Sequence, residues 1–274
     1  MQPAAVNESS RNRPSAFRSA VLCCVALAIS GCAASLLYPR LDSVVAYYLE
    51  DLVTLDEAQS QQLKRTLSAN LDWHRDSELG KYAGFLRGLA GSIEDRMDRE
   101  AWLQAGRQTE EYWRAIFAQA APGYIAVAAT LTDRQVAELM RNLAKEDEET
   151  WSEFAERTPG ERRSRREKSI TKTLQRFTGP LTPAQRAMVE EYSAGARPFM
   201  AEWRENRRIW RDALAATLVD RHAGEPFAVR MTQLIARPDD LWTPQYRMAI
   251  EGGRSALIDL LVDLDATLTA KQRG

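Results

Sequence analysis

The sequence predicts an all-α protein, an elongated bundle of long amphipathic helices that follows an N-terminal lipoprotein signal peptide. Apolar residues recur every three or four positions through most of the body, as they do on one face of a helix. No stretch alternates apolar and polar residues with the period of a strand. The chain has 274 residues, of which 45% are hydrophobic and 27% charged, so it is long enough for one large globular domain or two small ones.

The first element is an export signal. Three arginines precede an apolar run at positions 20–29, and the small residues Ser30 and Gly31 follow it. This order is typical of a secretory signal peptide. The apolar run is much shorter than the roughly 20 residues that span a bilayer, so a cleaved signal is favoured over an uncleaved anchor. We expect a signal peptide at residues 1–31 and a mature helical lipoprotein domain at residues 32–274.

Residues 29–32, Ile-Ser-Gly-Cys, resemble the lipobox of bacterial lipoproteins. The resemblance implies cleavage between Gly31 and Cys32, and a lipid such as palmitate on Cys32. Ala33 stands where lipoproteins retained at the inner membrane usually carry Asp, which implies sorting to the outer membrane, facing the periplasm. Two or more acyl chains make a stable anchor. The alternative is that Cys32 is a small apolar residue like the two cysteines inside the apolar run.

Charge and cysteine usage exclude several classes of function. The 37 basic and 38 acidic side chains give a net charge of -1, so no field draws the chain to nucleic acid, and we expect no nucleic-acid partner. All three cysteines lie within the first 32 residues, and only two histidines are present. The body therefore holds neither a disulfide framework nor a Cys/His zinc site, and we expect no metal and no cofactor.

The apolar stripes predict long helices. Two stripes predict helices at 79–93 and 136–154, the second interrupted by an acidic turn at 146–149. The longest stripe, at 188–218, predicts a helix of up to about 50 Å at 1.5 Å per residue. Pro198 should kink that helix, because proline removes a helical hydrogen bond and clashes with the preceding turn.

A last helix is expected at 248–264, with Gly252 and Gly253 as its weak point. The nearest approach to a strand, at 124–131, is too rich in alanine for a strand to be assigned. Turn residues mark further breaks between helices, which lie at 158–160, 178–180, 222–224 and 237–240.

A short motif, LTxxQ or a variant of it, recurs at the expected helix starts. Its polar residue accepts a hydrogen bond from the third helical amide, while the Gln reaches back to the cap amide, so the motif is a capping box. Each box should stabilise its helix by about 1 kcal/mol. The boxes comprise Leu55, Asp56 and Gln59; Leu131, Thr132 and Gln135; and Leu181, Thr182 and Gln185. Further matches lie at 242–246 and 268–272.

The boxes allow two interpretations. Trp73, Trp151 and Trp203 each follow a box along the chain, which is compatible with a degenerate repeat of box, amphipathic helix and aromatic residue. The alternative, favoured on physical grounds, is that capping boxes recur independently in any helical protein. The chain also ends two residues after the box at 268–272, so that match is either accidental or the start of a truncated helix.

The LTxxQ motif resembles the signature of the Spy and CpxP periplasmic chaperones, which are cradle-shaped helical proteins. A wider set of residues resembles a family of proteobacterial lipoproteins of unknown function, over about Cys32 to Gln272. That set comprises Tyr38 to Asp42, Leu55 to Gln59, Trp73 to Arg75, Glu78, Leu79, Tyr82, Trp203 and Trp210. The resemblances imply a lipid-anchored envelope protein that binds unfolded or assembling envelope proteins without ATP. The alternative is an assembly scaffold without chaperone activity.

Candidate catalytic residues are few. His74 lies between Asp72 and Asp76, and a histidine beside a carboxylate can act as a general base in a hydrolase. The favoured alternative is a turn between two helices in which Asp76 or Ser77 caps the second. Because no nucleophile, phosphate-binding or metal-binding motif accompanies His74, we expect no enzymatic activity.

Seven cations lie between Arg162 and Arg176, and an acidic segment precedes them at 146–156. The basic segment could contact lipid phosphates or an acidic partner. We favour intramolecular pairing, because the turn at Pro159 and Gly160 would fold the two helices antiparallel with opposite charges facing each other.

Overall fold

A computed structural model describes residue 38 and residues 41–273 of the chain. The expected signal peptide, including the cleavage site at Gly31 and Cys32, lies outside the described residues. Every regular element of the described residues is helical, so the all-α prediction is confirmed.

The elements follow one another with short connections. The first half contains α3 (Leu41–Leu52), α4 (Glu57–Trp73), the π-helix η2 (His74–Glu78), α5 (Leu79–Glu94), α6 (Arg99–Ala128) and α7 (Asp133–Ala155). The second half contains α8 (Pro159–Thr178), α9 (Pro183–Gly195), α10 (Met200–Val219), α11 (Glu225–Ala236), the 3₁₀-helix η3 (Pro238–Leu241), α12 (Pro244–Ala266) and α13 (Ala270–Arg273).

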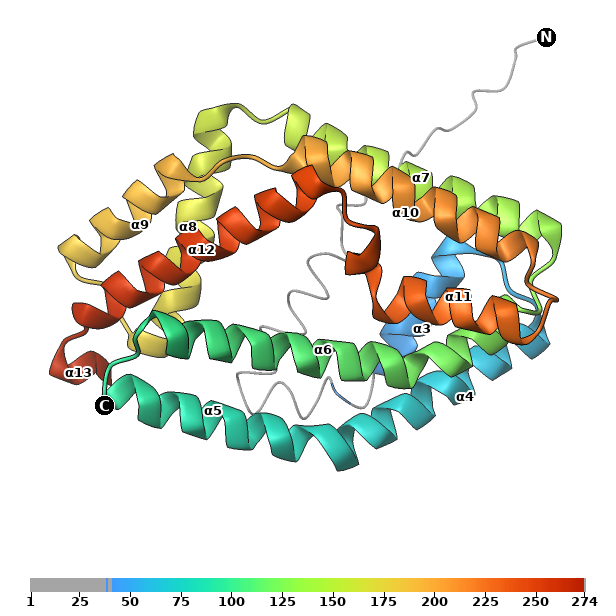
Figure 1. Ribbon diagram of the computed structural model, residues 1–274, viewed down its shortest axis with the longest axis horizontal. Helices are drawn as coiled ribbons and strands as arrows, with labels where there is room; N and C mark the ends of the chain where they lie inside the picture. Colours follow the sequence, from blue (N-terminus) through green and yellow to red (C-terminus); the bar gives the residue numbers. More distant parts are fainter. Residues whose placement is uncertain (1–37, 39–40, 274) are drawn as a thin grey trace, which may run out of the picture.

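Each half runs out along the long axis of the molecule and returns (Figure 1). In the first half α4 and α5 run outward and α6 returns beside them. In the second half α9 and α10 run in the opposite direction along the other side, and α12 returns. Helix α7 packs along α10, and both α11 and α12 pack against α6, so these contacts join the halves.

The main core lies where the two halves meet. Its buried residues come from α3, α6, α7, α10 and α11, and comprise Leu52, Ala121, Ile125, Leu143, Leu214, Leu218, Phe227, Met231 and Leu234. A second cluster joins α3, α4 and α6. There α6 approaches α4 so closely at Gly123 that a Cβ atom would collide with the side chain of Thr66. Glycine is therefore required at this crossing.

Two sequence expectations about helix continuity are wrong. The acidic residues at 146–149 do not interrupt a helix, since α7 runs unbroken through them. The single helix expected at 188–218 is two helices, because α9 ends at Gly195 and the chain turns extended at Ala196 before α10 begins. Pro198 explains the break, since proline lacks an N–H and disfavours helical conformation in the residue before it.

The turn expected at His74 is also wrong. No helix begins at Asp76 or Ser77, and α4 passes through the π-helix η2 directly into α5. The amide of Leu79 donates to the carbonyl of His74, five residues earlier. The extra residue in this turn reorients the side chains around it, and Glu78 becomes buried with only 1% of its surface exposed.

The expected pairing between the acidic and basic segments does not occur. The acids of α7 bind arginines of α10: Asp147 accepts from Arg207 Nε at 2.9 Å, and Glu148 accepts from Arg204 at 2.6 Å. Helix α8 packs against α9 instead of α7. The apolar periodicity of α7 could not show which neighbour would meet its acidic face.

Candidate functional site

The three complete motif boxes cap helices as predicted. Asp56, Thr132 and Thr182 are the N-caps of α4, α7 and α9, and each accepts a hydrogen bond from the amide of the Gln three residues on. In return each Gln side chain accepts from the cap amide, at 2.8 to 2.9 Å. A further box, Thr158 with Glu161, begins α8, and its TxxE pattern was present in the sequence but was not singled out.

The boxes also pair across the fold. Gln59 Nε2 donates to the carbonyl of Thr130, directly before the second box, and Gln135 Nε2 donates to the carbonyl of Thr54, directly before the first. The two amides contact each other, with Gln135 Nε2 donating to Gln59 Oε1 at 2.6 Å. We call this arrangement the first glutamine junction.

The same arrangement recurs at the opposite end of the molecule. Gln185 Nε2 donates to the carbonyl of Thr267, and Gln272 Nε2 donates to the carbonyl of Pro180. The two side-chain amides are 3.0 Å apart. The match at 268–272 is therefore no accident: it forms a second glutamine junction, although the helix it begins, α13, has only four residues.

The match at 242–246 is a partial box. Thr243 caps α12, but the third helical residue is Tyr246 instead of Gln, and the amide of Thr243 donates to Asn206. In the complete boxes the motif leucines Leu131 and Leu181 are buried. Gln59, Gln135 and Gln185 are 4%, 5% and 0% exposed, so these glutamines lie inside the fold, where they position helices.

His74 lies in a cluster of aromatic residues at the π-helix. Its Nδ1 is 2.9 Å from the hydroxyl of Tyr38, which itself donates to the carbonyl of Leu71. Its ring also contacts Tyr82, at a centroid distance of 5.4 Å. Burial lowers the pKa of His74, an effect that the charge of Glu78 partly offsets.

The carboxylates next to His74 in sequence do not act on it. Asp72 and Asp76 both bind Arg75, at 2.8 and 3.0 Å. The buried Glu78 accepts from Lys81 through Oε1, while its Oε2 has no hydrogen-bond partner among the described residues. Burial raises the pKa of the Tyr82 hydroxyl to about 12, so this hydroxyl stays protonated at neutral pH.

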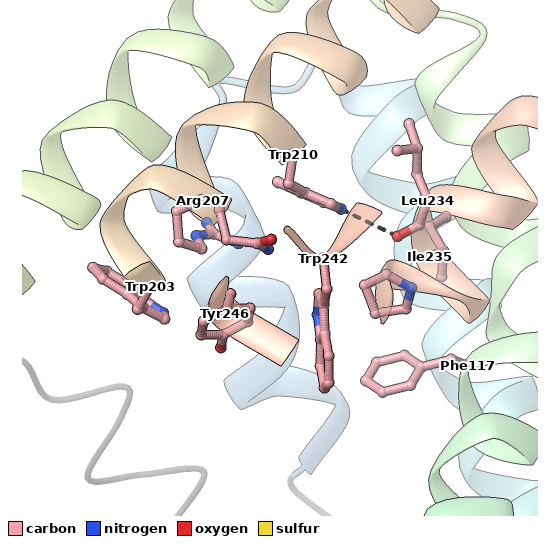
Figure 2. Close-up of a pocket in the computed structure, with 10 residues that line it drawn as sticks. Phe117, Trp203, Arg207, Trp210, Leu234, Ile235, Trp242 and Tyr246 are labelled. Carbon is pink, nitrogen blue, oxygen red and sulfur yellow. Dashed lines mark hydrogen bonds between the residues drawn. The ribbon is translucent and has the colours of Figure 1, made fainter. Parts of the chain in front are cut away.

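An aromatic hollow of about 430 Å³ lies between α6, α10, α11, η3 and α12 (Figure 2). Its walls are mainly aromatic and aliphatic. The residues that line it are Phe117, Trp203, Asn206, Arg207, Trp210, Leu234, Ile235, Pro238, Trp242 and Tyr246. Arg207 is the one charged side chain among them.

Contacts around the hollow fix its wall residues. Trp210 Nε1 donates to the carbonyl of Leu234 at 3.2 Å, and the guanidinium of Arg207 lies 4.8 Å from the Trp210 ring (Figure 2). Trp242 and Tyr246 pack edge to face at 5.3 Å. Burial raises the pKa of the Tyr246 hydroxyl. The hollow is thus a preformed apolar surface with one cation.

Exposed aromatic surface continues beyond the hollow. Phe117, on its wall, is 42% exposed and stacks on Trp113, which is 43% exposed. At the other side Phe199 contacts Tyr246. The sequence does not reveal this hollow, because an aromatic stripe at helical spacing is the same pattern whether it packs in a core or lines an open surface.

Two further properties bear on function. No helix among residues 41–273 is long and apolar enough to cross a membrane. Within the same part of the chain, no three His, Cys, Asp or Glu side chains are grouped so that they could hold a metal ion.

Comparison with known proteins identifies a single family. No curated protein and no solved structure matches the chain significantly. Residues 51–247 match the model of DUF6279, a family of unknown function, and this range extends from the end of α3 to the start of α12. It includes both partners of the first glutamine junction and the whole lining of the aromatic hollow. The chain belongs to the DUF6279 family.

Proposed function

We propose that this protein is a non-enzymatic lipoprotein of the outer membrane that binds other envelope proteins in the periplasm, and that it does so through the aromatic hollow. The observation that carries the proposal is the gathering of three tryptophans, a tyrosine and a phenylalanine around one concave apolar surface. Binding sites are commonly concave, mostly apolar and of about 300–1,000 Å³. A hollow of this kind suits the apolar side chains that an unfolded or assembling protein exposes.

The environment of His74 supports a binding role over hydrolysis. Its two neighbouring carboxylates bind Arg75, and its Nδ1 is engaged by Tyr38. A general base needs a reacting group within hydrogen-bond reach. The contacts of His74 instead hold Tyr38 against the body of the protein.

The proposed attachment to the membrane is supported by the sequence of residues 29–32. Mass spectrometry of the mature protein should find an acylated Cys32 at its N-terminus, and Cys32→Ala should release the protein from membranes. An N-terminus at residue 1 in the mature protein would contradict the proposed processing.

Client binding is tested with a soluble form that contains residues 38–273 and with a permanently unfolded polypeptide as the client. We expect the soluble form to suppress the aggregation of an unfolded client without ATP. Phe117→Ser should weaken binding by a factor of about 5 to 30, as expected for the loss of about 1–2 kcal/mol of apolar contact. Phe177→Ser on α8 is the matched control, because Phe177 is 59% exposed and lies outside the hollow.

Binding assays and light scattering give the outcome. Equal binding by the Phe117→Ser and Phe177→Ser variants would exclude the hollow as the client site. No suppression by the unmodified protein would favour the alternative function, an assembly scaffold without chaperone activity.

A further inference from the structure

Helix α8 presents four cations on one face. Arg165, Lys168, Lys172 and Arg176 are three, four and four residues apart, a spacing that aligns them along the helix. All four side chains are exposed, and α8 contains no buried residue. We call these four residues the basic stripe. At 1.5 Å per residue it extends over about 16 Å.

These four cations have no acidic partner in the described part of the chain, whereas the other cations at the start of α8 do have partners. Arg162 donates to the carbonyls of Phe154 and Arg157, Arg163 binds Glu167, and Arg166 donates to the carbonyl of Ser193. The acids of α7 that could have paired with the stripe bind α10 instead. The net positive charge of α8 is therefore left uncompensated along the stripe.

Like charges at this spacing repel each other, so the stripe weakens its own helix unless an anion lies against it. Next to the stripe, α8 and α9 enclose a hollow of about 310 Å³, lined by Lys168 and Lys172 of the stripe together with Arg186. Two acids also line it, but one of them, Glu167, is already bound by Arg163. The chemistry of the stripe and this hollow fits phosphate groups.

The stripe is long for a single anion. Its four cations extend over about 16 Å, so a row of lipid headgroups can contact all of them, whereas one phosphate ion contacts only part of the row. Phe177 follows Arg176 and is 59% exposed, but consecutive residues of a helix point in different directions, so its ring does not share the face of the stripe.

We propose that the basic stripe forms a membrane-contact surface that rests on the phosphate headgroups of anionic lipids. Tyr38 is bound to the body, so at most about 22 Å of extended chain separates it from Cys32. If Cys32 is lipidated, the body is held close to the membrane, and the stripe then fixes which side faces the lipid. The stripe itself is independent of the aromatic hollow and of the acyl chain.

The test uses the full chain carrying Cys32→Ala, so that no acyl chain contributes. Its binding is titrated with vesicles of phosphatidylcholine, alone or with phosphatidylglycerol. We expect about tenfold or tighter binding to the anionic vesicles at low salt, and loss of this preference when the four stripe residues are changed to Gln. The matched control changes four exposed cations without ion-pair partners on other helices, Arg65, Arg87, Arg134 and Arg141, to Gln, and should retain most of the preference.

Circular dichroism first establishes that both variants remain folded. Equal binding to the two kinds of vesicle, or equal losses in the stripe and control variants, would overturn the proposal. Release by about 10 mM inorganic phosphate at constant ionic strength would overturn it too, since the stripe would then bind a free anion. Client binding should be unchanged in the stripe variant, and vesicle binding unchanged in Phe117→Ser, so this proposal and the client proposal fail separately.

Discussion

Each half of the molecule contains a glutamine junction, and the two junctions differ in how deeply they are buried. In the first, Gln59 and Gln135 are both buried, and their boxes begin helices of 17 and 23 residues. In the second, Gln185 is buried, but Gln272 is partly exposed and begins a helix of four residues. The hydrogen bonds of the two junctions are alike, so the junctions differ in their burial and in the length of the helices that they begin.

The halves also differ at the point where one outward helix passes to the next, from α4 to α5 in the first half and from α9 to α10 in the second. The first half passes through a π-helix that stays hydrogen-bonded and encloses Glu78, with His74 packed beside it. The second half breaks completely between Gly195 and Met200. One motif therefore forms a similar junction in each half, while the segments between its copies differ.

The largest expected effect is at the first junction. Gln135→Ala removes the return half of a capping box and the hydrogen bonds of Gln135 to the carbonyl of Thr54 and to the Gln59 amide, while Gln59 keeps its bonds with Thr130 and Asp56. Each lost hydrogen bond contributes about 0.5–1.5 kcal/mol, and a cap about 1 kcal/mol, so we expect the free energy of unfolding to fall by about 2–4 kcal/mol. Urea denaturation measures this change. A loss below 1 kcal/mol would mean that the amide pair adds little to the cap.

The second junction should be less sensitive. Gln272→Ala removes the matching hydrogen bonds, but Pro180 and Thr269 are exposed to water, the buried Gln185 keeps its bonds with Thr182 and Thr267, and only α13 depends on that cap. We expect a loss of about 0.5–1 kcal/mol in the same denaturation experiment. Equal losses for Gln272→Ala and Gln135→Ala would show that burial does not distinguish the junctions.

Local patterns predicted the helices and their starts. Apolar spacing and the boxes at Asp56, Thr132 and Thr182 depend on residues within one turn, so the sequence displays them directly. The pairing of Gln59 with Gln135 joins residues 76 positions apart and depends on how α4 and α7 meet. No local rule specifies that meeting, and the reciprocal amide pairs were missed for that reason.

The aromatic hollow was harder to predict from the sequence than the helices were. In the sequence, Trp203 and Trp210 belong to an apolar stripe and to the family resemblance, and Trp242 belongs to a variant box, but none of these patterns places the three side chains together. Their convergence requires α10 to lie next to η3 and α12, which is a tertiary property. The π-helix at His74 was hidden too, because one extra residue in a turn leaves the apolar pattern on either side unchanged.

The smallest predicted effect is a pH dependence at the break of the first half. Burial lowers the pKa of His74 in the folded protein, so the unfolded chain binds more protons at mildly acidic pH. The stability contributed by neutral His74 is therefore present near pH 7.5 and declines as the pH falls through the ordinary histidine value of about 6.5 toward the lower folded value. We expect the loss to stay below about 1 kcal/mol, because His74 is only half-buried.

Denaturation at about pH 7.5 and 5.5 should show that His74→Gln reduces this decline, whereas His222→Gln, at an exposed position in the second half, leaves it intact. A decline that is equal in the two variants would place the acid-sensitive group elsewhere and would remove this difference between the halves.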